Sequence, residues 1–215
     1  MSVFSEAWTW LTTSANWHGD DGVPHRFAQH LGYTALTVAV AVAIAVPLGL
    51  WIGHTGRLRG FAVALTGALR ALPTLGLLTL VVLWRGIGLT PPITALVVLA
   101  IPPLLAGAYA GVESVDRRTV DAARGMGMTE WQVLTRVEVP LGLPLLLGGL
   151  RSAVLQVVAT ATIAAYIGLG GLGRYVIDGV AIRDYPQILA GSLIVVVLAL
   201  ALDGMFALLQ RLAPA

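Results

Sequence analysis

Residues 121–144 read DAARGMGMTEWQVLTRVEVPLGLP, a polar, arginine-bearing island in a chain that is strongly apolar on either side of it. The island is too polar to cross a bilayer and too well patterned to be a plain linker. A membrane protein that keeps such a segment on one side of the membrane usually binds a partner there. The alternative interpretation is an amphipathic loop that rests on lipid headgroups.

The island is expected to fold as two short helices. Thr129 begins a capping box, with a glutamine three residues later, and this pattern starts a helix. Gly125 and Gly127, just before it, are typical of a helix end. The pattern therefore predicts a helix over about 117–124, a turn, and a second helix over about 129–137.

Small and apolar side chains give this helix pair a surface that a partner protein can approach. Ala122 and Ala123 keep one face of the first helix small, and Trp131 offers apolar contact beside it. Pro140 is expected to end the second helix, because the residue before a proline disfavours helical dihedrals. The sequence therefore predicts a compact knob of two helices at a sharp angle.

The composition places the chain in a membrane. The 215 residues are 57% hydrophobic and only 11% charged, with a mean hydropathy of +0.85, whereas soluble domains carry roughly 25% charged residues. A net charge of only +2 argues against nucleic-acid binding. The absence of cysteine excludes disulfides and cysteine-ligated metal. We predict an all-α integral membrane protein built as one compact bundle.

Five apolar segments are long enough to cross about 30 Å of hydrocarbon as helices. They define a single transmembrane domain over 31–212, with a polar loop over 113–140 within it. The predicted spans are about 31–53, 61–84, 91–112, 141–167 and 187–209.

The arginines orient these spans, since positively charged loops stay on the cytoplasmic side. An odd number of spans puts the two termini on opposite sides. The side that holds the 113–140 loop carries Arg57, Arg59, Arg117, Arg118, Arg124, Arg136 and Arg211. The other side carries Arg26, Arg85, Arg174 and Arg183. We therefore expect a multi-pass plasma (inner) membrane protein with an external N-terminus, a cytoplasmic C-terminus and a cytoplasmic 113–140 loop.

Residues 1–30 form an external or interfacial segment in this scheme rather than a sixth span. Trp8, Trp10 and Trp17 stand among serine, threonine and asparagine, and tryptophan prefers the membrane–water interface. We expect a helix that lies on the membrane surface. The alternative is a frayed terminus.

Three ionisable residues, Arg70, Arg151 and Asp203, lie inside the predicted spans. Charges there are costly and usually face a partner or a cavity. Counted from the cytoplasmic ends of their spans, the three lie at similar depth, so Asp203 can pair with Arg151 or with Arg70. We favour an Arg151–Asp203 ion pair that orients the helices over a direct role in transport.

Prolines are expected to interrupt two of the spans. Pro73-Thr74 breaks the second span and Pro102-Pro103 the third. Broken helices are tolerated where the freed carbonyls face protein or a water-filled path, and they often mark transport sites. The alternative at each site is a packing kink without a role in transport. Tyr166 can add a cation–π contact to a quaternary ammonium group.

Motifs that would indicate catalysis are incomplete. GLGGLG at residues 168–173 has the spacing of a dinucleotide-binding turn, but a membrane helix precedes it instead of a strand. A phosphate-binding P-loop needs a lysine, which this chain lacks, so ATP hydrolysis of that kind must come from another subunit. The histidines lack the helical spacing of shared metal ligands. We predict no catalytic residue and no metal site.

The island resembles the coupling motif of membrane-spanning subunits of ABC importers: Glu-Ala-Ala, three residues, Gly, nine or ten residues, then apolar–x–apolar–Pro. The matching positions are Asp121, Ala122, Ala123, Gly127, Val137, Val139 and Pro140. Asp121 departs from the usual glutamate and retains a carboxylate on a shorter arm. Residues 125–144, with 41–53, 70–83 and 161–173, resemble the branch that carries glycine betaine, choline or carnitine.

The resemblance implies a five-helix core of the type I importer kind, acting as a dimer of identical or related permeases. It implies that the 113–140 loop, with Trp131 and Arg136, sits in a cleft of a cytoplasmic ATPase. That ATPase binds ATP and magnesium, so no cofactor is expected in this chain. The resemblance also implies an external solute-binding protein, and a place for Gly170 and Gly171 near the outer gate.

Other functions stay open at this point. An importer permease of the same fold can carry a different solute, such as an amino acid or a betaine-type thiol-histidine. A channel needs no ATPase partner. An enzyme in the membrane needs converging nucleophiles, bases or metal ligands, and the ionisable residues within the spans are only Arg70, Arg151 and Asp203.

Overall fold

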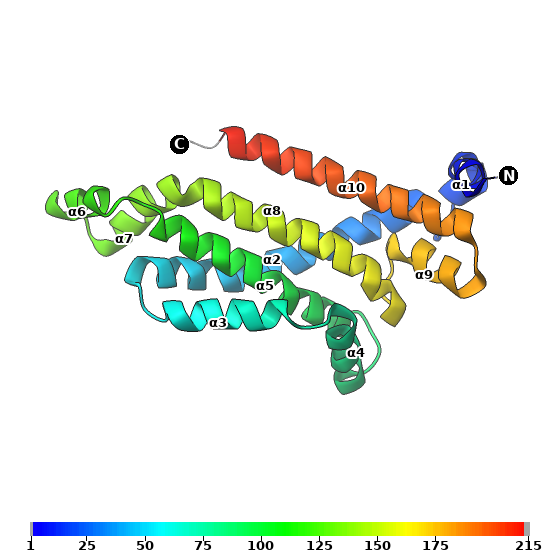
Figure 1. Cartoon of the computed structure of the whole chain (residues 1–215), viewed down its shortest axis with the longest axis horizontal. Coiled ribbons are helices and arrows are strands. Elements are labelled where there is room, and N and C mark those ends of the chain that lie inside the picture. Colours follow the sequence, from blue (N-terminus) through cyan, green and yellow to red (C-terminus); the bar gives the residue numbers. More distant parts are fainter. Residues whose placement is uncertain (1, 213–215) are drawn as a thin grey trace. The chain divides into compact units, whose positions relative to one another are not determined.

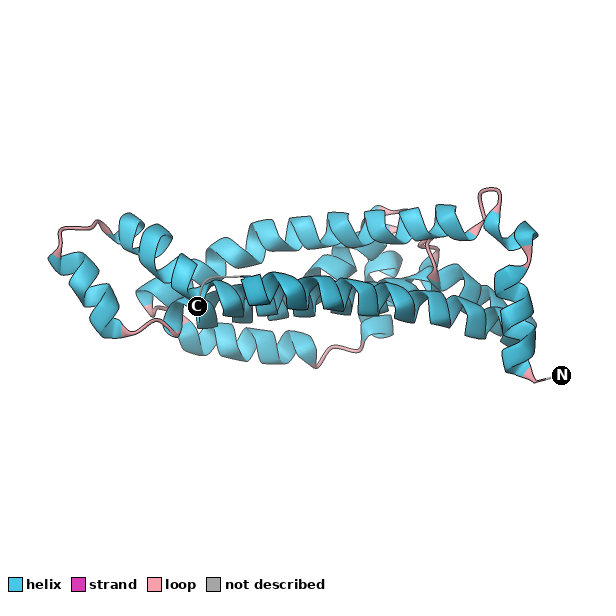
Figure 2. Cartoon of the chain, turned by 90° about the horizontal axis from the view of Figure 1, so that it is seen from above, coloured by secondary structure: helices cyan, strands magenta, loops and turns pink. Residues whose placement is uncertain are grey.

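The computed structural model describes residues 2–212, and every regular element within them is a helix (Figures 1 and 2). Short helical turns labelled η join several of the α-helices. The elements are α1 (Val3–Thr12), η1 (Ser14–Trp17), α2 (Val23–Thr55), α3 (Arg59–Arg70), α4 (Thr74–Arg85), α5 (Thr90–Glu113), α6 (Arg117–Gly125), α7 (Glu130–Val133), η2 (Leu134–Glu138), α8 (Val139–Ala164), η3 (Ala165–Ile167), α9 (Gly173–Ile182) and α10 (Tyr185–Leu212).

Within residues 2–212, four helical stretches are long and apolar enough to cross a membrane: α2, α5, Glu130–Ile167 and α10. A fifth span is present if α3 and α4 count as one broken span. The break lies at residues 71–73, where Pro73 caps α4 in an extended conformation. The predicted all-α membrane architecture and the break at Pro73 are confirmed.

The helix that carries the first predicted span begins earlier than expected. Residues 23–30 are the first two turns of α2. The region before α2 holds the short helix α1, whose Phe4 and Trp8 are exposed, while Trp10 packs edge-on against Tyr175 at 5.2 Å between ring centroids.

The third span is continuous, so the expected interruption at Pro102-Pro103 was wrong. Both prolines lie within α5. A Cβ added to Gly149 of α8 would stand 2.7 Å from the Pro103 carbonyl oxygen, so the backbone of α8 covers the helix there. Membrane helices tolerate internal proline where a neighbouring helix packs against the altered backbone.

The chain divides into two compact units. The first unit comprises Met1–Thr37, Pro73–Val97 and Leu155–Leu202. The second comprises Val38–Leu72, Val98–Val154 and Asp203–Ala215.

One apolar cluster in the first unit joins α4 and α5 to the end of α8. Leu78 and Val81 of α4 pack with Leu96 of α5 and with Ala161 and Ala164 of α8. A second cluster in the same unit includes Val158, Leu172 and Tyr175. These contacts hold the broken half-helix α4 against continuous helices.

Glycines bring α5 and α8 to backbone distance in the second unit. A Cβ on Gly107 would stand 2.6 Å from the Gly149 Cα atom, and a Cβ on Gly111 would stand 2.7 Å from the Gly142 carbonyl oxygen. Gly107 and Gly111 form a G-x-x-x-G pair, the spacing by which transmembrane helices approach closely. This motif was not among the features predicted from the sequence.

Candidate functional site

We refer to residues 113–140 as the coupling segment, and all of them belong to the second unit. Its first helix, α6, begins where the Asp116 side chain accepts a hydrogen bond from the Arg118 backbone N–H at 2.9 Å. A short polar side chain at this position satisfies one of the free N–H groups of the first helical turn. The polar sequence thus ends the membrane helix α5 and starts a separate helix.

Gly127 ends α6 through its backbone conformation. Its φ is +86°, in the left-handed region that glycine adopts most readily. The Gly127 N–H donates to the Arg124 carbonyl at 2.9 Å, and the Met128 N–H donates to the Ala123 carbonyl at 3.2 Å. This pair of bonds is a Schellman motif, which satisfies the last carbonyls of a helix and turns the chain sharply.

The predicted capping box begins the second helix. The Thr129 N–H donates to the Gln132 side chain at 2.9 Å, and the Gln132 N–H donates back to the Thr129 hydroxyl at 3.4 Å. The two short helices and the sharp turn between them therefore follow from local sequence.

The second helix does not stop before the fourth span, so the expected stop at Pro140 was wrong. Glu130 to Ile167 is one continuous helical stretch. A π-helical turn, η2, precedes Pro140, and there the Val139 N–H donates to the Leu134 carbonyl, five residues back. Such a turn inserts an extra residue into the hydrogen-bond ladder, which accommodates the missing N–H and the bulky ring of proline.

The coupling segment has an apolar interior of its own. Val115, Val120, Ala123 and Val133 are buried together, and Met128 and Val137 pack around them. Ala123 is only 2% exposed, so it fills the interior of the knob. The prediction that Ala122 and Ala123 share a small outer face was therefore wrong, since only Ala122 is exposed.

The outer surface of the coupling segment combines apolar and charged side chains. Met126 is 74% exposed and Trp131 is 72% exposed. Asp121 and Arg136 are also exposed. Met126 and Trp131 are therefore the large apolar side chains that this polar segment leaves exposed among the residues that the structure describes.

Arg124 fixes the two helices of the knob to each other. Its guanidinium donates to both carboxylate oxygens of Glu130, at 3.0 and 2.9 Å, and stands 3.5 Å from Asp121. The hydrogen bonds to Glu130 raise the pKa of Arg124 above its ordinary value. Arg124 therefore stays charged and cross-links α6 and α7.

His54 joins the end of α2 to this segment. Its Nδ1 atom lies 2.5 Å from Glu138 Oε2, and its Nε2 atom lies 3.1 Å from Glu130 Oε2. The side chains of His54 and Glu138 are only 12% and 6% exposed. The sequence gives no signal for this contact. His54 is a single histidine at the end of a span, and Glu138 occupies the unspecified position between the two apolar residues of the motif.

The structure brings Arg151 and Asp203 together in the second unit. Arg151 donates to both carboxylate oxygens of Asp203, and its Nη1 atom donates to Gln210 at 3.0 Å. Arg70, the other candidate partner, lies in the last turn of α3.

Residues 45–213 match the family described as binding-protein-dependent transport system inner membrane component. The chain belongs to this family.

The chain is similar to curated permeases of this family over most of their length. It is 34% identical over 187 residues to the carnitine transport permease protein OpuCB of Listeria monocytogenes, covering 86% of each chain. It is 36% identical over 187 residues to the osmoprotectant import permease protein OsmW of Salmonella typhimurium, covering 85% of this chain and 87% of the relative. The chain is thus a permease subunit of an ABC importer.

A solved structure shares the fold of this binding-protein-dependent permease. A chain of the MetNI methionine ABC transporter superposes with a TM-score of 0.77 at 21% identity, covering 87% of this chain and 94% of that one. The predicted type I importer architecture is therefore confirmed, and the protein is a multi-pass membrane protein.

The permease residues expected along the translocation path all belong to the first unit. Pro73 and Thr74 begin α4, and Tyr166 in η3 is 64% exposed. Gly171 has a φ of +85°, and its N–H donates to the Gln29 side chain at 3.0 Å. Gly170 lies against the same glutamine, so the two glycines anchor the loop after η3 to α2.

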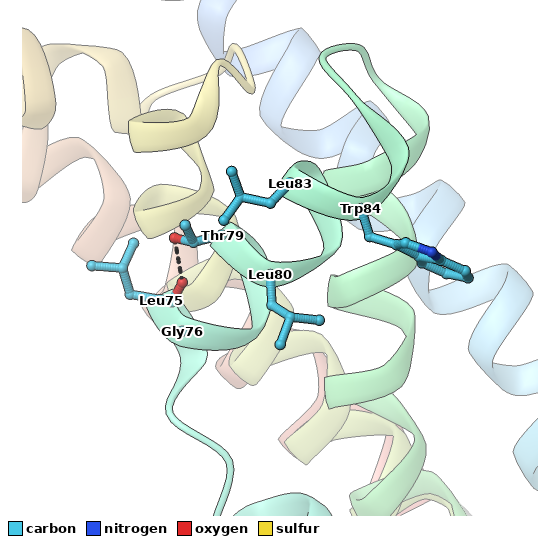
Figure 3. A pocket seen from close by; sticks show the side chains of 6 residues that line it. All are labelled: Leu75, Gly76, Thr79, Leu80, Leu83 and Trp84. Atoms are coloured by element: carbon cyan, nitrogen blue, oxygen red, sulfur yellow. Dashed lines mark hydrogen bonds between the residues drawn. The ribbon is translucent and has the colours of Figure 1, made fainter.

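Helix α4 of the permease presents an apolar face (Figure 3). The Thr79 hydroxyl donates to the Leu75 carbonyl at 2.8 Å, so it adds no free polar group to this face. Leu83 and Trp84 are 81% and 77% exposed. A hollow on this face is lined by Leu75, Gly76, Thr79, Leu80, Leu83 and Trp84.

Proposed function

We propose that this permease imports a quaternary-ammonium osmoprotectant such as glycine betaine, choline or carnitine. The support is the identity of 34–36% to permeases named for carnitine and for osmoprotectants, over 85% or more of each chain. The likeness to the methionine transporter, at 21% identity, supports only the fold. An amino acid or a betaine-type thiol-histidine is the second candidate, and a channel is a distant third.

The observation that carries the coupling mechanism is the construction of the 113–140 segment. It is a knob with its own buried core, and it is stiffened by the Arg124–Glu130 bonds. The side chains of Trp131 and Met126 are exposed on its surface. These features support a rigid body that a separate ATPase grips, with Trp131 as an apolar anchor and Asp121 and Arg136 as charged contacts around it.

In this mechanism the energy comes from outside the permease. ATP and magnesium bind the partner ATPase subunits, whose closure moves the coupling segment of each of two permease chains. Because η2 and α8 continue this segment without a break, its displacement passes directly into a membrane helix. The spans then alternate between outward- and inward-open arrangements.

The translocation path is proposed to run past the first unit's broken helix and glycine loop. Pro73 and Thr74 supply a helix start where backbone groups lack intrahelical partners. Tyr166 supplies an exposed aromatic face that suits a quaternary ammonium ion. Gly170 and Gly171 let the loop after η3 approach α2 closely. An external solute-binding protein delivers the solute, with the N-terminus outside and the coupling segment in the cytoplasm.

Reconstitution tests this proposal directly. The permease, its ATPase and its solute-binding protein are placed in proteoliposomes with ATP, and uptake of radiolabelled glycine betaine, choline and carnitine is compared with uptake of methionine and histidine. Uptake of a quaternary ammonium compound that requires both ATP and the binding protein is expected. Uptake confined to amino acids would replace the substrate assignment, and uptake without ATP would indicate a channel.

A further inference from the structure

A histidine in the last turn of α2, His54, contacts the coupling segment at two places. His54 is the second-last residue of the helix Val23–Thr55. Its two ring nitrogens face carboxylate oxygens of different residues, Glu138 at 2.5 Å and Glu130 at 3.1 Å. Glu130 belongs to α7, in the knob, whereas Glu138 ends the π-helical turn that joins the knob to α8.

The contact with Glu138 is sheltered from solvent. A carboxylate that is 6% exposed needs a partner, because removing a charge from water without compensation is costly. Among the described residues, the partner of the Glu138 carboxylate is the His54 ring. The contact between His54 and Glu138 lies at a π-helical turn. Because such turns are frequent at functional sites, this position indicates a role for the contact.

The contact with Glu130 extends the connection through the knob. Glu130 also accepts two hydrogen bonds from Arg124, which faces Asp121. A chain of polar contacts thus runs from α2 through His54, Glu130 and Arg124 to Asp121, the acidic residue of the motif.

Other charged groups surround this imidazole. A small cavity lined by His54 and Glu138 is also lined by Glu113 of α5 and by Arg117 and Arg124 of α6. Arg59 of α3 binds Glu113 at 2.5 Å. The carboxylates of Glu138 and Glu130 are nonetheless the groups that touch the ring.

We propose that His54 is a positioning residue that ties the end of α2 to the coupling segment by bridging Glu138 and Glu130. The inference rests on the proposed coupling function. Each ring nitrogen of His54 faces a different carboxylate, so one side chain holds both glutamates against the end of α2. The bridge passes the displacement of the knob to α2 as well as to α8.

A protease assay tests the bridge without any ATPase. The purified permease, in detergent, is cleaved by an arginine-specific protease, and the cleavage rates of the wild type and of two His54 variants are compared. Cleavage at Arg124 and Arg136 requires local opening of the knob. We expect cleavage to be slow in the wild type, fast in His54→Gln, which cannot donate to both carboxylates from the same place, and slow in His54→Lys, whose ammonium group can donate to both.

Transport per ATP tests the positioning role. In proteoliposomes, His54→Gln is expected to lower solute uptake per ATP hydrolysed by about tenfold, and His54→Lys is expected to retain coupling. His18→Gln is the matched control, since His18 is exposed and its ring contacts the nearby Ser14 carbonyl, far from the coupling segment in sequence.

The outcomes separate the inference from the proposed function. Wild-type cleavage and wild-type uptake per ATP in His54→Gln would overturn the inference, as would altered cleavage without altered coupling. Glu138→Gln provides a second variant if His54→Gln fails to fold, and it must show the same faster cleavage and the same loss of uptake per ATP. Failure of the wild type to transport would count against the proposed function alone, because the protease assay would still report the bridge.

Discussion

Arg151 and Asp203 form a two-pronged ion pair between α8 and α10, with Nε–Oδ1 at 2.6 Å and Nη2–Oδ2 at 2.8 Å. Both side chains are about one-third exposed. Gln210 lies about two helical turns after Asp203 in α10. Its side chain accepts from the same guanidinium and donates to the Pro144 carbonyl at 3.4 Å. The pair and the glutamine thus fix the register of α10 against α8.

Separating the two charges is expected to harm the fold more than reversing them. Arg151→Leu and Asp203→Leu each leave one charge without its partner at membrane depth, so the yield of monodisperse protein in mild detergent should fall severalfold. The reversed pair, Arg151→Asp with Asp203→Arg, should recover much of that yield. Size-exclusion chromatography measures this, and no recovery in the double variant would contradict an orienting role for the pair.

The backbone at Gly127 should tolerate only residues that accept a left-handed conformation. A Cβ at Gly127 would meet nothing within 4 Å, so the constraint is its φ of +86° and not the available space. An L-residue there costs roughly 1–2 kcal/mol. We expect Gly127→Val to uncouple uptake from ATP hydrolysis while membrane insertion continues, and Gly127→Asn to have a smaller effect.

Gly125→Ala is the matched control for that series. Gly125 lies in the last turn of α6 and also has open space around a Cβ. Because its φ is not positive, alanine there should leave coupling intact. Equal losses in Gly125→Ala and Gly127→Val would show that the segment is sensitive to side-chain bulk and not to the turn.

Trp131 is expected to anchor the coupling segment in its ATPase. Trp131→Ala should weaken binding of the ATPase by about tenfold or more, as loss of an aromatic anchor does, with little effect on the folded permease, because the side chain is 72% exposed. Affinity is measured by biolayer interferometry on permease in nanodiscs. Trp8→Ala is the control, since Trp8 is similarly exposed but lies in α1. Unchanged affinity in Trp131→Ala would move the docking surface elsewhere.

The features that sequence alone predicts well here are local ones. The knob follows from Gly127 and the capping box at Thr129, and the break of the second span follows from Pro73, because each of these acts on its own neighbours. Contacts across helices were harder to predict. Ala123 faces inward because Val133 packs on it from the next helix, and Pro140 sits in a continuous helix because a π-helical turn precedes it.

Two long-range features had unequal signals in the sequence. The G-x-x-x-G spacing of Gly107 and Gly111 was readable, since transmembrane helices use it to pack closely. The bridge from His54 to Glu138 joins residues 84 positions apart, and neither residue stands in a pattern that indicates the other. Such a contact depends on the packing of whole helices and requires the structure.

Adjacent glycines on α8 should respond in opposite ways to alanine. A Cβ on Gly149 would stand 2.7 Å from a backbone oxygen of α5, whereas a Cβ on Gly148 would meet only the end of the flexible Gln210 side chain, at 3.3 Å. Alanine normally favours a helix over glycine by about 0.5–1 kcal/mol. We expect Gly148→Ala to leave the melting temperature in detergent equal or higher and Gly149→Ala to lower it. A fall of equal size in both would contradict the close packing of α5 and α8.

Tyr175 should make the first unit sensitive to alkali. Its hydroxyl donates to the Asp21 carbonyl at 2.5 Å, and burial raises its pKa to about 12, above the value of about 10 for free tyrosine. The folded protein therefore keeps a proton that the unfolded chain releases, so stability is present in full below pH 10 and declines as the pH rises from 10 towards 12. Thermal unfolding in detergent should show a fall in melting temperature over this range that is smaller in Tyr175→Phe. Absorbance near 295 nm should show a late-titrating tyrosine in the wild type, and a late step that persists in Tyr175→Phe would assign it to another ring.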